Sequence, residues 1–311
     1  MSLIAVLDDY QGRANEFANW SSLDVPIRFV PQHLAANDLI EAVRDCDVIV
    51  AMRERTAFPA AVLAELPNLR LLVTTGMANA AIDISAAHEL GIVVSGTASS
   101  GAGTVELTWA LVLAAVKHLP LEDRALRSGN WQVSLATDLA GKQLGLIGLG
   151  RLGSGMVPVA MAFGMEVVAW SQNLTAERAS EVGVQLVTKD ELISTSDVIS
   201  IHVRLSNRTE GMIGANEIAS MKPGALLVNS SRGPIVDEAA LITALQQNKI
   251  AAALDVYDIE PMPANHPFTK LDNVVIAPHL GYASEANMAV MFEGVVEDIA
   301  AFFAGAPIRI I

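Results

Sequence analysis

Leu144-Gly145-Leu146-Ile147-Gly148-Leu149-Gly150-Arg151-Leu152-Gly153-Ser154 is the stretch that decides the fold of this chain. A short apolar run leads into glycines spaced as G-x-G-x-x-G, and a helical pattern follows, so the context is strand, turn and helix. Gly148 permits the tight turn, Gly150 lets the backbone approach a pyrophosphate, and Gly153 lets the helix pack closely on the strand. The N–H groups at the start of the helix then face the phosphates. The stretch predicts a dinucleotide-binding site rather than a glycine-rich turn that binds nothing.

The composition indicates the class of protein around that stretch. The chain has 311 residues, 52% hydrophobic and 17% charged, which is enough for two domains with large cores. A net charge of −14 argues against a nucleic-acid partner, because phosphates require a basic surface. Residues 109–116, the most apolar stretch, are too few to cross a membrane, and residues 3–7 meet Asp8 and Asp9 without the basic flank of a signal peptide. We therefore expect a cytoplasmic protein that binds neither membrane nor nucleic acid, with its one cysteine, Cys46, in a structural role.

Short β-branched runs alternate with helical patterns along the chain, which is typical of parallel sheets joined by crossover helices. The expected strands form two series, 4–7, 27–30, 48–51, 71–74 and 92–95, then 143–147, 166–170, 198–202, 225–229, 251–254 and 274–277. The main expected helices are 38–44, 59–66, 84–90 (ended by a left-handed Gly91), 104–117 and 284–303. Pro158 falls inside the helix after the glycines, where we expect a kink or compensation by packing.

These patterns predict an α/β fold with two doubly wound parallel-sheet domains. The first is a flavodoxin-like substrate (catalytic) domain of residues 1–99 and 284–311, and the second is a Rossmann NAD(P)-binding domain of residues 100–283. We expect the active site in the cleft between them.

Three polar residues each follow a predicted strand, namely Arg232, Glu260 and His279. Ligands of doubly wound sheets bind outside the carboxyl ends of the strands, so these side chains can converge. Arginine offers a bidentate fork to a carboxylate or carbonyl, and histidine exchanges a proton near neutral pH. A glutamate bonded to the imidazole fixes its tautomer and favours its charged form. Together they would polarise a 2-oxo acid, or deprotonate a 2-hydroxy acid, while a hydride moves to or from a nicotinamide.

Each of the three also has an ordinary structural interpretation. Arg232 could cap a strand end or pair with Asp237, Glu260 could be an exposed loop residue, and His279 could be a satisfied structural histidine. Their joint placement after consecutive strands favours a catalytic group.

The chain resembles the D-isomer-specific 2-hydroxyacid dehydrogenases, which include glyoxylate/hydroxypyruvate reductases, D-lactate dehydrogenases and phosphoglycerate dehydrogenases. The resemblance is strongest over residues 145–281 and is carried by Met221-Lys222-Pro223-Gly224-Ala225-Leu226-Leu227-Val228-Asn229, Ser231-Arg232-Gly233-Pro234-Ile235-Val236-Asp237, Glu260-Pro261 and Pro278-His279-Leu280-Gly281. It implies that Arg232 holds the substrate, that His279 is the acid/base and that Glu260 supports it.

The resemblance also implies a substrate loop whose backbone amides bind the carboxylate, formed by Thr75, Gly76, Met77 and Ala78. The family more often has a second glycine where Ala78 stands. Arg53 falls where some relatives place a substrate contact, although a solvated charge run is an equal alternative. The expected cofactor site comprises Gly148, Gly150, Arg151, Leu152, Gly153, Ser171, Arg204, Ser230, Asp255, Gly281 and Thr104. Asp255 would bond the nicotinamide carboxamide, or otherwise make a strand-end turn.

The cofactor itself is NAD or NADP, and the sequence leaves the choice open. NAD-specific relatives carry an acidic residue after the second Rossmann strand, where this chain reads Trp170-Ser171-Gln172-Asn173. Arg178 is interpreted as solvated on the next helix. Arg204 stands where proline is common, and either lines the adenosine side or adds charge that favours a phosphate.

The leading hypothesis is an NAD(P)-dependent D-2-hydroxyacid dehydrogenase that acts on a small 2-oxo or 2-hydroxy acid such as glyoxylate, hydroxypyruvate or pyruvate. The alternative is a dinucleotide-sensing protein or corepressor of the same fold without turnover. No metal is expected. The resemblance implies a homodimer, formed through helices of the nucleotide-binding domain such as residues 104–117.

Overall fold

The computed structural model describes residues 2–311, which divide into two compact units. The first unit ends at Ser100 and resumes at Tyr282, and the second is Gly101–Gly281. These limits lie one and two residues from the expected domain boundaries.

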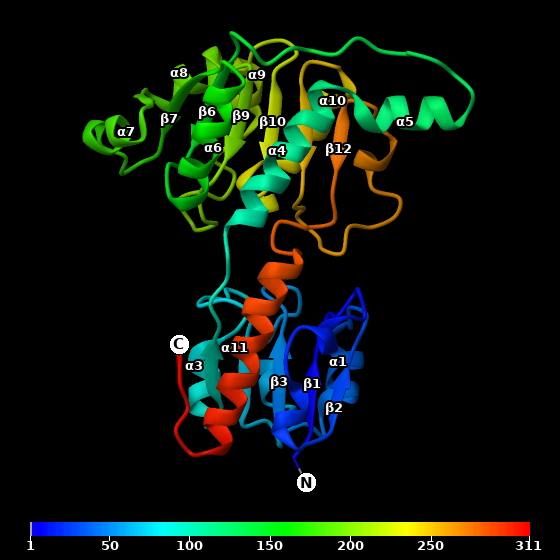
Figure 1. Cartoon of the computed structure of the whole chain (residues 1–311), viewed down its shortest axis with the longest axis vertical. Coiled ribbons are helices and arrows are strands. Elements are labelled where there is room, and N and C mark those ends of the chain that lie inside the picture. The colour runs from blue at the N-terminus through cyan, green and yellow to red at the C-terminus, as the bar shows by residue number, and fades with distance from the viewer. Residues whose placement is uncertain (1) are drawn as a thin grey trace. The chain divides into compact units, whose positions relative to one another are not determined.

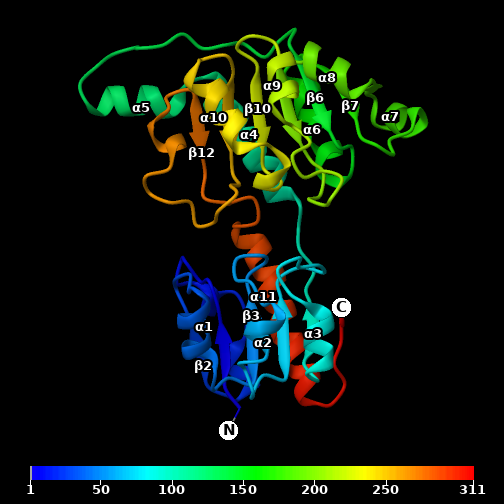
Figure 2. The same ribbon diagram turned by 180° about the vertical axis from the view of Figure 1, so that it is seen from behind.

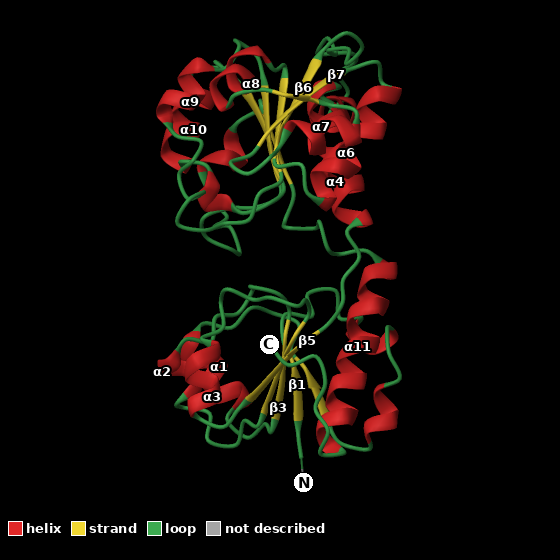
Figure 3. Cartoon of the chain, turned by 90° about the vertical axis from the view of Figure 1, so that its left-hand side faces the viewer, coloured by secondary structure: helices red, strands yellow, loops and turns green. Residues whose placement is uncertain are grey.

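The first unit contains a five-stranded parallel sheet in the order β2-β1-β3-β4-β5, the flavodoxin-like order (Figure 1). Its strands are β1 (Ile4–Val6), β2 (Ile27–Phe29), β3 (Val48–Ala51), β4 (Leu71–Thr74) and β5 (Val93–Gly96). Its helices are α1 (Ala36–Val43), α2 (Ala60–Leu63), α3 (Ile84–Glu89) and α11 (Glu285–Phe303), with 3-10 turns η1 (Ala14–Glu16) and η2 (Trp20–Leu23). Helices α1, α2 and α3 cover one face of the sheet and α11 covers the other (Figures 2 and 3).

Strand β1 shows why the strands of this sheet are mostly apolar. Successive side chains of a strand point to opposite faces. Ala5 packs in the core under α1–α3, whereas Ile4 and Val6 pack in the core under α11. All three are fully buried, so the sheet has no polar face, as expected for parallel sheets.

The second unit contains a seven-stranded parallel sheet in the order β12-β11-β10-β9-β6-β7-β8. Its strands are β6 (Gln143–Ile147), β7 (Glu166–Trp170), β8 (Gln185–Leu186), β9 (Val198–Ile201), β10 (Leu226–Asn229), β11 (Ala251–Leu254) and β12 (Val274–Ile276). Its helices are α4 (Ala102–Val116), α5 (Leu119–Arg127), α6 (Arg151–Ala162), α7 (Ala176–Val182), α8 (Lys189–Thr195), α9 (Ala215–Ser220) and α10 (Glu238–Gln246), with 3-10 turns η3 (Gly233–Ile235) and η4 (Pro267–Lys270). The strand order reverses between β6 and β9, which is where Rossmann sheets bind dinucleotides.

The expected fold class is confirmed, and so are all the expected strands to within one residue at each end. Gly91 has φ +76°, as a left-handed C-cap requires. Strand β8 was not predicted, because two edge residues are too short to show a pattern. Helix α6 continues through Pro158, which is exposed, so water can bond the carbonyl that the proline leaves without a partner.

Across residues 2–311 no single helix is long and apolar enough to cross a bilayer, and only α4 and α5 reach that measure together, across a bend of 61°.

Candidate active site

The glycine loop joins β6 to α6 and has the geometry that a pyrophosphate needs. Gly148 has φ +101°, and a Cβ there would lie 2.7 Å from the carbonyl oxygen of His202. A Cβ on Gly153 would lie 2.0 Å from the carbonyl oxygen of Gly148, so the helix starts in backbone contact with the turn. A Cβ on Gly150 would meet no atom within 4 Å. The open space therefore lies at Gly150, beside the unpaired first N–H groups of α6, and this loop fits a dinucleotide.

His202 lies directly against this loop, and sequence reasoning gave it no role. Its backbone N–H donates to the carbonyl of Ile147, and its Nε2 lies 2.9 Å from the hydroxyl of Ser200. Burial lowers the pKa of His202 to about 4, so the ring is neutral at physiological pH. The sequence feature that could have identified His202 is its position directly after β9, one of the two strands between which the strand order of the sheet reverses.

The Glu260–His279 pair is the central polar contact of the second unit. Nδ1 of His279 lies 2.6 Å from Oε2 of Glu260, and the two side chains are 14% and 20% exposed. The other carboxylate oxygen of Glu260 accepts the backbone N–H of Tyr257 at 3.0 Å. This geometry is the predicted glutamate–imidazole couple, and it excludes the interpretation of Glu260 as an exposed loop residue.

Arg232 follows β10 on a loop that is fixed from within. Asn229 donates from Nδ2 to the carbonyl of Arg232 at 2.9 Å and accepts the N–H of Ser231 at 3.0 Å. The guanidinium donates to the carbonyl of Ser231 at 2.7 Å. Asp237, the alternative partner of Arg232, instead caps α10 by accepting the N–H of Ala240.

The Arg232 loop and the Glu260 loop touch through backbone atoms. A Cβ on Gly233 would lie 2.2 Å from the carbonyl carbon of Tyr257 and 2.6 Å from the nitrogen of Asp258. Only glycine fits at this contact. The three predicted catalytic residues therefore lie on one connected framework at the carboxyl ends of β10, β11 and β12.

Four predicted cofactor residues gather at the same edge of the sheet. The Asp255 carboxylate accepts the N–H groups of Leu280 at 2.7 Å and Gly281 at 2.9 Å. Thr104 donates from its hydroxyl to the carbonyl of Gly281 at 2.7 Å. One turn later, Thr108 lies 2.7 Å from the hydroxyl of Ser230. The start of α4 is thus bonded to the ends of β10 and β12, and Asp255 does make the strand-end turn that was its alternative role.

The other predicted cofactor residues lie in the first turn of α6 and after the ends of β7 and β9. Arg151 is exposed and its guanidinium lies over Gly101, where a Cβ would come within 2.7 Å of Nη1. The half-buried residues are Leu152 and Ser171, and Arg204 is exposed. Arg178 lies on α7 and pairs with Glu181 at 3.1 Å, as a solvated residue would.

The predicted substrate loop lies in the first unit, after β4. Thr75 donates its N–H to the carbonyl of Ala51 and Gly76 donates to that of Thr74, so these two amides are already used. Within residues 2–311, the amides of the loop without a bonded acceptor are those of Met77 and Ala78. Met77 and Ala78 therefore supply the loop amides that could bind a carboxylate.

Arg53 supports that loop rather than lying in solvent. Its guanidinium donates to the carbonyl of Thr75 at 3.3 Å, and its backbone N–H donates to the hydroxyl of Thr75 at 3.0 Å. The side chain is only 24% exposed. The solvated interpretation of Arg53 is therefore wrong.

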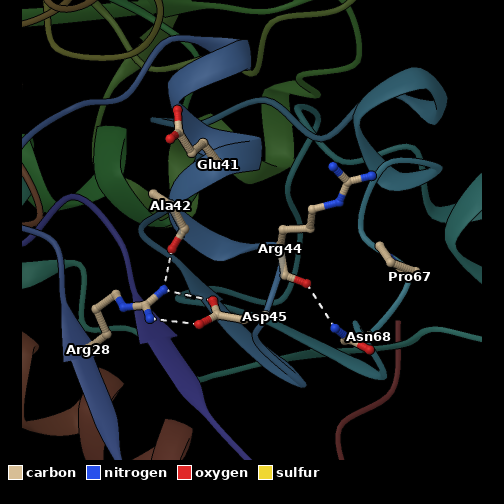
Figure 4. A pocket seen from close by; sticks show the side chains of 7 residues that line it. All are labelled: Arg28, Glu41, Ala42, Arg44, Asp45, Pro67 and Asn68. Atoms are coloured by element: carbon tan, nitrogen blue, oxygen red, sulfur yellow. Dashed lines mark hydrogen bonds and ion pairs between the residues drawn. The ribbon is translucent and has the colours of Figure 1, made fainter.

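A hollow of about 590 Å³ in the first unit lies elsewhere (Figure 4). Both arginines of its lining are already paired, Arg28 with Asp45 at 2.9 Å and Arg44 with Glu65 at 3.6 Å. Arg28 lies on β2, and the other lining residues precede β3 or β4, on the side opposite the carboxyl ends of those two strands. Volume alone does not identify the site here.

Sequence reasoning missed the residues that hold the predicted catalytic ones, above all Tyr257, Gly233 and Asn229. The Tyr257 hydroxyl donates to the carbonyl of Ala277 at 2.8 Å and lies 3.2 Å from that of Leu254, and so joins the ends of β12 and β11. The sequence feature that could have identified these three residues is their closeness in sequence to Arg232 and Glu260.

Three comparisons bear on this site. Residues 109–281 match the family described as D-isomer specific 2-hydroxyacid dehydrogenase, NAD binding domain. D-3-phosphoglycerate dehydrogenase of Archaeoglobus fulgidus is 36% identical over 98% of this chain and 58% of its own length. Glyoxylate reductase of Korarchaeum cryptofilum is 36% identical over 86% of this chain and 82% of its own length.

Among solved structures, phosphoglycerate oxidoreductase from Vibrio cholerae o395 has a TM-score of 0.94 at 34% identity, covering 98% of this chain and 100% of that one. The chain spans little more than half the length of the Archaeoglobus relative. Its second unit is the NAD-binding domain that the matched family describes. The chain belongs to the D-isomer-specific 2-hydroxyacid dehydrogenase family.

Proposed function

We propose that this chain is an NAD(P)-dependent oxidoreductase that interconverts a small 2-oxo acid and the corresponding D-2-hydroxy acid. The observation that carries the proposal is the 2.6 Å contact between His279 and Glu260, on a framework that also holds Arg232. The glycine loop of the same unit supports the dinucleotide, and the Korarchaeum relative, named a glyoxylate reductase, supports a small 2-oxo acid as substrate.

The roles of the side chains follow from their contacts. The nicotinamide, when bound, supplies or accepts the hydride. Glu260 keeps the proton of His279 on Nδ1, so Nε2 exchanges a proton with the substrate oxygen. The imidazolium formed in that exchange is stabilised by the neighbouring carboxylate. Arg232 binds the substrate carboxylate and polarises the carbonyl.

The residues after β7 bear on the choice between NADH and NADPH. No carboxylate follows β7 to repel a 2′-phosphate, and the arginine nearest in sequence, Arg178, is paired with Glu181. We therefore expect both cofactors to bind, with a modest difference in affinity.

The test is the decay of NADH and NADPH absorbance with glyoxylate, hydroxypyruvate and pyruvate. His279→Ala should abolish turnover while NADH binding persists, and Arg232→Ala should raise KM and lower kcat together. Arg178→Ala, which removes an exposed arginine, is the matched control and should leave both constants unchanged. Cofactor binding without turnover on any of these acids would instead favour the dinucleotide sensor.

We also infer a homodimer, but through a different surface from the one expected. Helix α4 packs its apolar residues, Trp109, Leu111 and Val112 among them, inside its own unit. Five exposed large apolar side chains lie together on α5 and the segment that follows it, and they are Leu119, Leu126, Trp131, Val133 and Leu135. A dimer of twice 32.9 kDa by light scattering, converted to monomer by Leu135→Asp, would support this surface.

A cytoplasmic location is part of the same proposal. Cys46 is buried, and burial first, then the nearby Asp45 carboxylate, raises the pKa of its thiol to about 12. Such a thiol is unreactive and suits a structural role in a reducing compartment.

A further inference from the structure

The catalytic Glu260 sits on a long connection that needs external support. Between Leu254, the end of β11, and Val274, the start of β12, the chain contains only the 3-10 turn η4. Loops of this length in compact domains are held by specific contacts or become mobile. Since Glu260 must stay within hydrogen-bond distance of His279, whatever holds this loop also sets the catalytic pair.

Glu238, the first residue of α10, contacts this loop on both sides of Glu260. Its Oε2 accepts the N–H of Asp258 at 3.5 Å, two residues before Glu260. Its Oε1 lies 3.1 Å from Nε2 of His266, six residues after Glu260. The two side chains are 23% and 13% exposed, so the contact is largely shielded from water.

The orientation of His266 is fixed by its own neighbours. Its Nδ1 accepts the N–H of Phe268 at 3.4 Å, so Nε2 carries the proton and donates to Glu238. Its ring lies 4.7 Å from the ring of Phe268, which in turn lies 6.3 Å from that of Tyr257. This aromatic series ends at Tyr257, whose N–H donates to Glu260.

The charges around this pair form one local cluster. Burial, then the carboxylates of Glu238 and Asp237, raise the pKa of Asp258, while His266 opposes them. Removing Glu238 or His266 therefore changes both the position of the Tyr257–Asp258 backbone and the electrostatic field around it.

We propose that Glu238 and His266 are positioning residues for the Glu260–His279 pair, because they clamp both arms of the loop that carries Glu260. Glu238 acts through Asp258 and His266 and makes no contact with the reacting atoms. Gly233 completes the arrangement, since it packs on the same Tyr257–Asp258 peptide from the side of Arg232. The proposal rests on the proposed function for its kinetic test.

The test is the pH dependence of kcat/KM for 2-oxo acid reduction in Glu238→Ala. A loosened Glu260 stabilises the protonated His279 less, so the midpoint of the profile should move to lower pH by about one unit. Above the midpoint, kcat/KM should fall about ten-fold, with the Kd of NADH unchanged because the glycine loop is distant in sequence and on another strand. Glu238→Gln, which keeps one acceptor for His266, should restore part of the profile.

Glu217→Ala is the matched control. Glu217 also lies in the first turn of a helix of the same unit, α9, and is 24% exposed, but it pairs with Lys189 at 2.7 Å. It should lower stability without moving the pH profile. If the profiles of Glu238→Ala and wild type coincide, the proposal is wrong.

NMR titration of the His279 ring separates this inference from the proposed function. Should the wild type reduce no 2-oxo acid, the function fails, yet the titration midpoint of His279 still moves in Glu238→Ala if the clamp is real. Should Glu238→Ala not fold, His266→Leu removes the donor while keeping the volume and must give the same shift. An unchanged titration in the folded variant overturns the inference.

Discussion

Gly150 and Gly153 lie three residues apart in one loop, but alanine should affect a different property at each position. We expect it to lower the stability of the fold at Gly153 and the affinity for the cofactor at Gly150. A Cβ on Gly153 would lie 2.0 Å from a backbone oxygen, about 1 Å closer than real Cβ atoms approach anything. That oxygen belongs to the turn and cannot rotate away, so we expect Gly153→Ala to lower the free energy of unfolding by about 3 kcal/mol.

Gly150→Ala should leave the fold intact. The residue has φ −77° and ψ −163°, which alanine adopts, and the added Cβ meets nothing within 4 Å. Alanine is a poorer N-cap by about 1 kcal/mol, but it restricts the unfolded chain by about 0.4–1 kcal/mol, so the two effects nearly cancel. The same Cβ occupies the space through which a pyrophosphate reaches the N–H groups of α6. Losing one or two hydrogen bonds to a charged group costs about 3 kcal/mol, or roughly 100-fold in the Kd of NADH.

Urea unfolding and NADH titration by fluorescence measure the two quantities separately. Gly150→Ala should match the wild-type unfolding midpoint and bind NADH about 100-fold more weakly. Wild-type NADH affinity in this variant would refute the position of the pyrophosphate. Wild-type stability in Gly153→Ala would refute the argument from the close contact.

Two further outcomes follow from buried contacts. Gly233→Ala would put a Cβ 2.2 Å from the carbonyl carbon of Tyr257, so it should lose about 2–4 kcal/mol in urea unfolding, and wild-type stability would contradict the contact. Burial raises the pKa of Asp298 to about 6 against the ion pair with Arg309. The folded chain therefore holds that proton more tightly than the unfolded chain, and its stability falls as pH rises from about 4 to about 7. Relative to Asp298→Asn, the wild type should lose about 3 kcal/mol over this range, and a constant difference between the two proteins would contradict the assignment.

The fold could be predicted from the sequence because both sheets are parallel and buried on both faces. Val48–Ala51 is apolar at every position and Leu71–Thr74 at every position but its last, so the limits of both runs are visible without any partner strand. The two-residue strand β8 could not be found this way, because its pairing with β7 depends on the sheet and not on its own residues.

The chemistry of the site could be predicted for residue types that have few roles at the end of a buried strand. Arg232, Glu260 and His279 each follow a strand end, and the polar contact between the last two was expected. The supporting contacts were not, because they join segments far apart in sequence. Nothing in the neighbourhood of Glu238 indicates His266, 28 residues later, and nothing around Arg53 indicates the hydroxyl of Thr75.

His279 has an unusual backbone, and its neighbours explain how it is held there. Its φ of +54° is in the left-handed region, which side chains other than glycine rarely adopt. Its N–H donates to the carbonyl of Ala277, and the next two N–H groups donate to the Asp255 carboxylate. The ring is held separately by Glu260. Since Asp255 fixes the chain on which the imidazole stands, it positions His279 as well as the expected cofactor site. A role for Asp255 in cofactor binding therefore does not compete with its role in the turn, because an ionised carboxylate has about four acceptor sites and these two N–H groups occupy two of them.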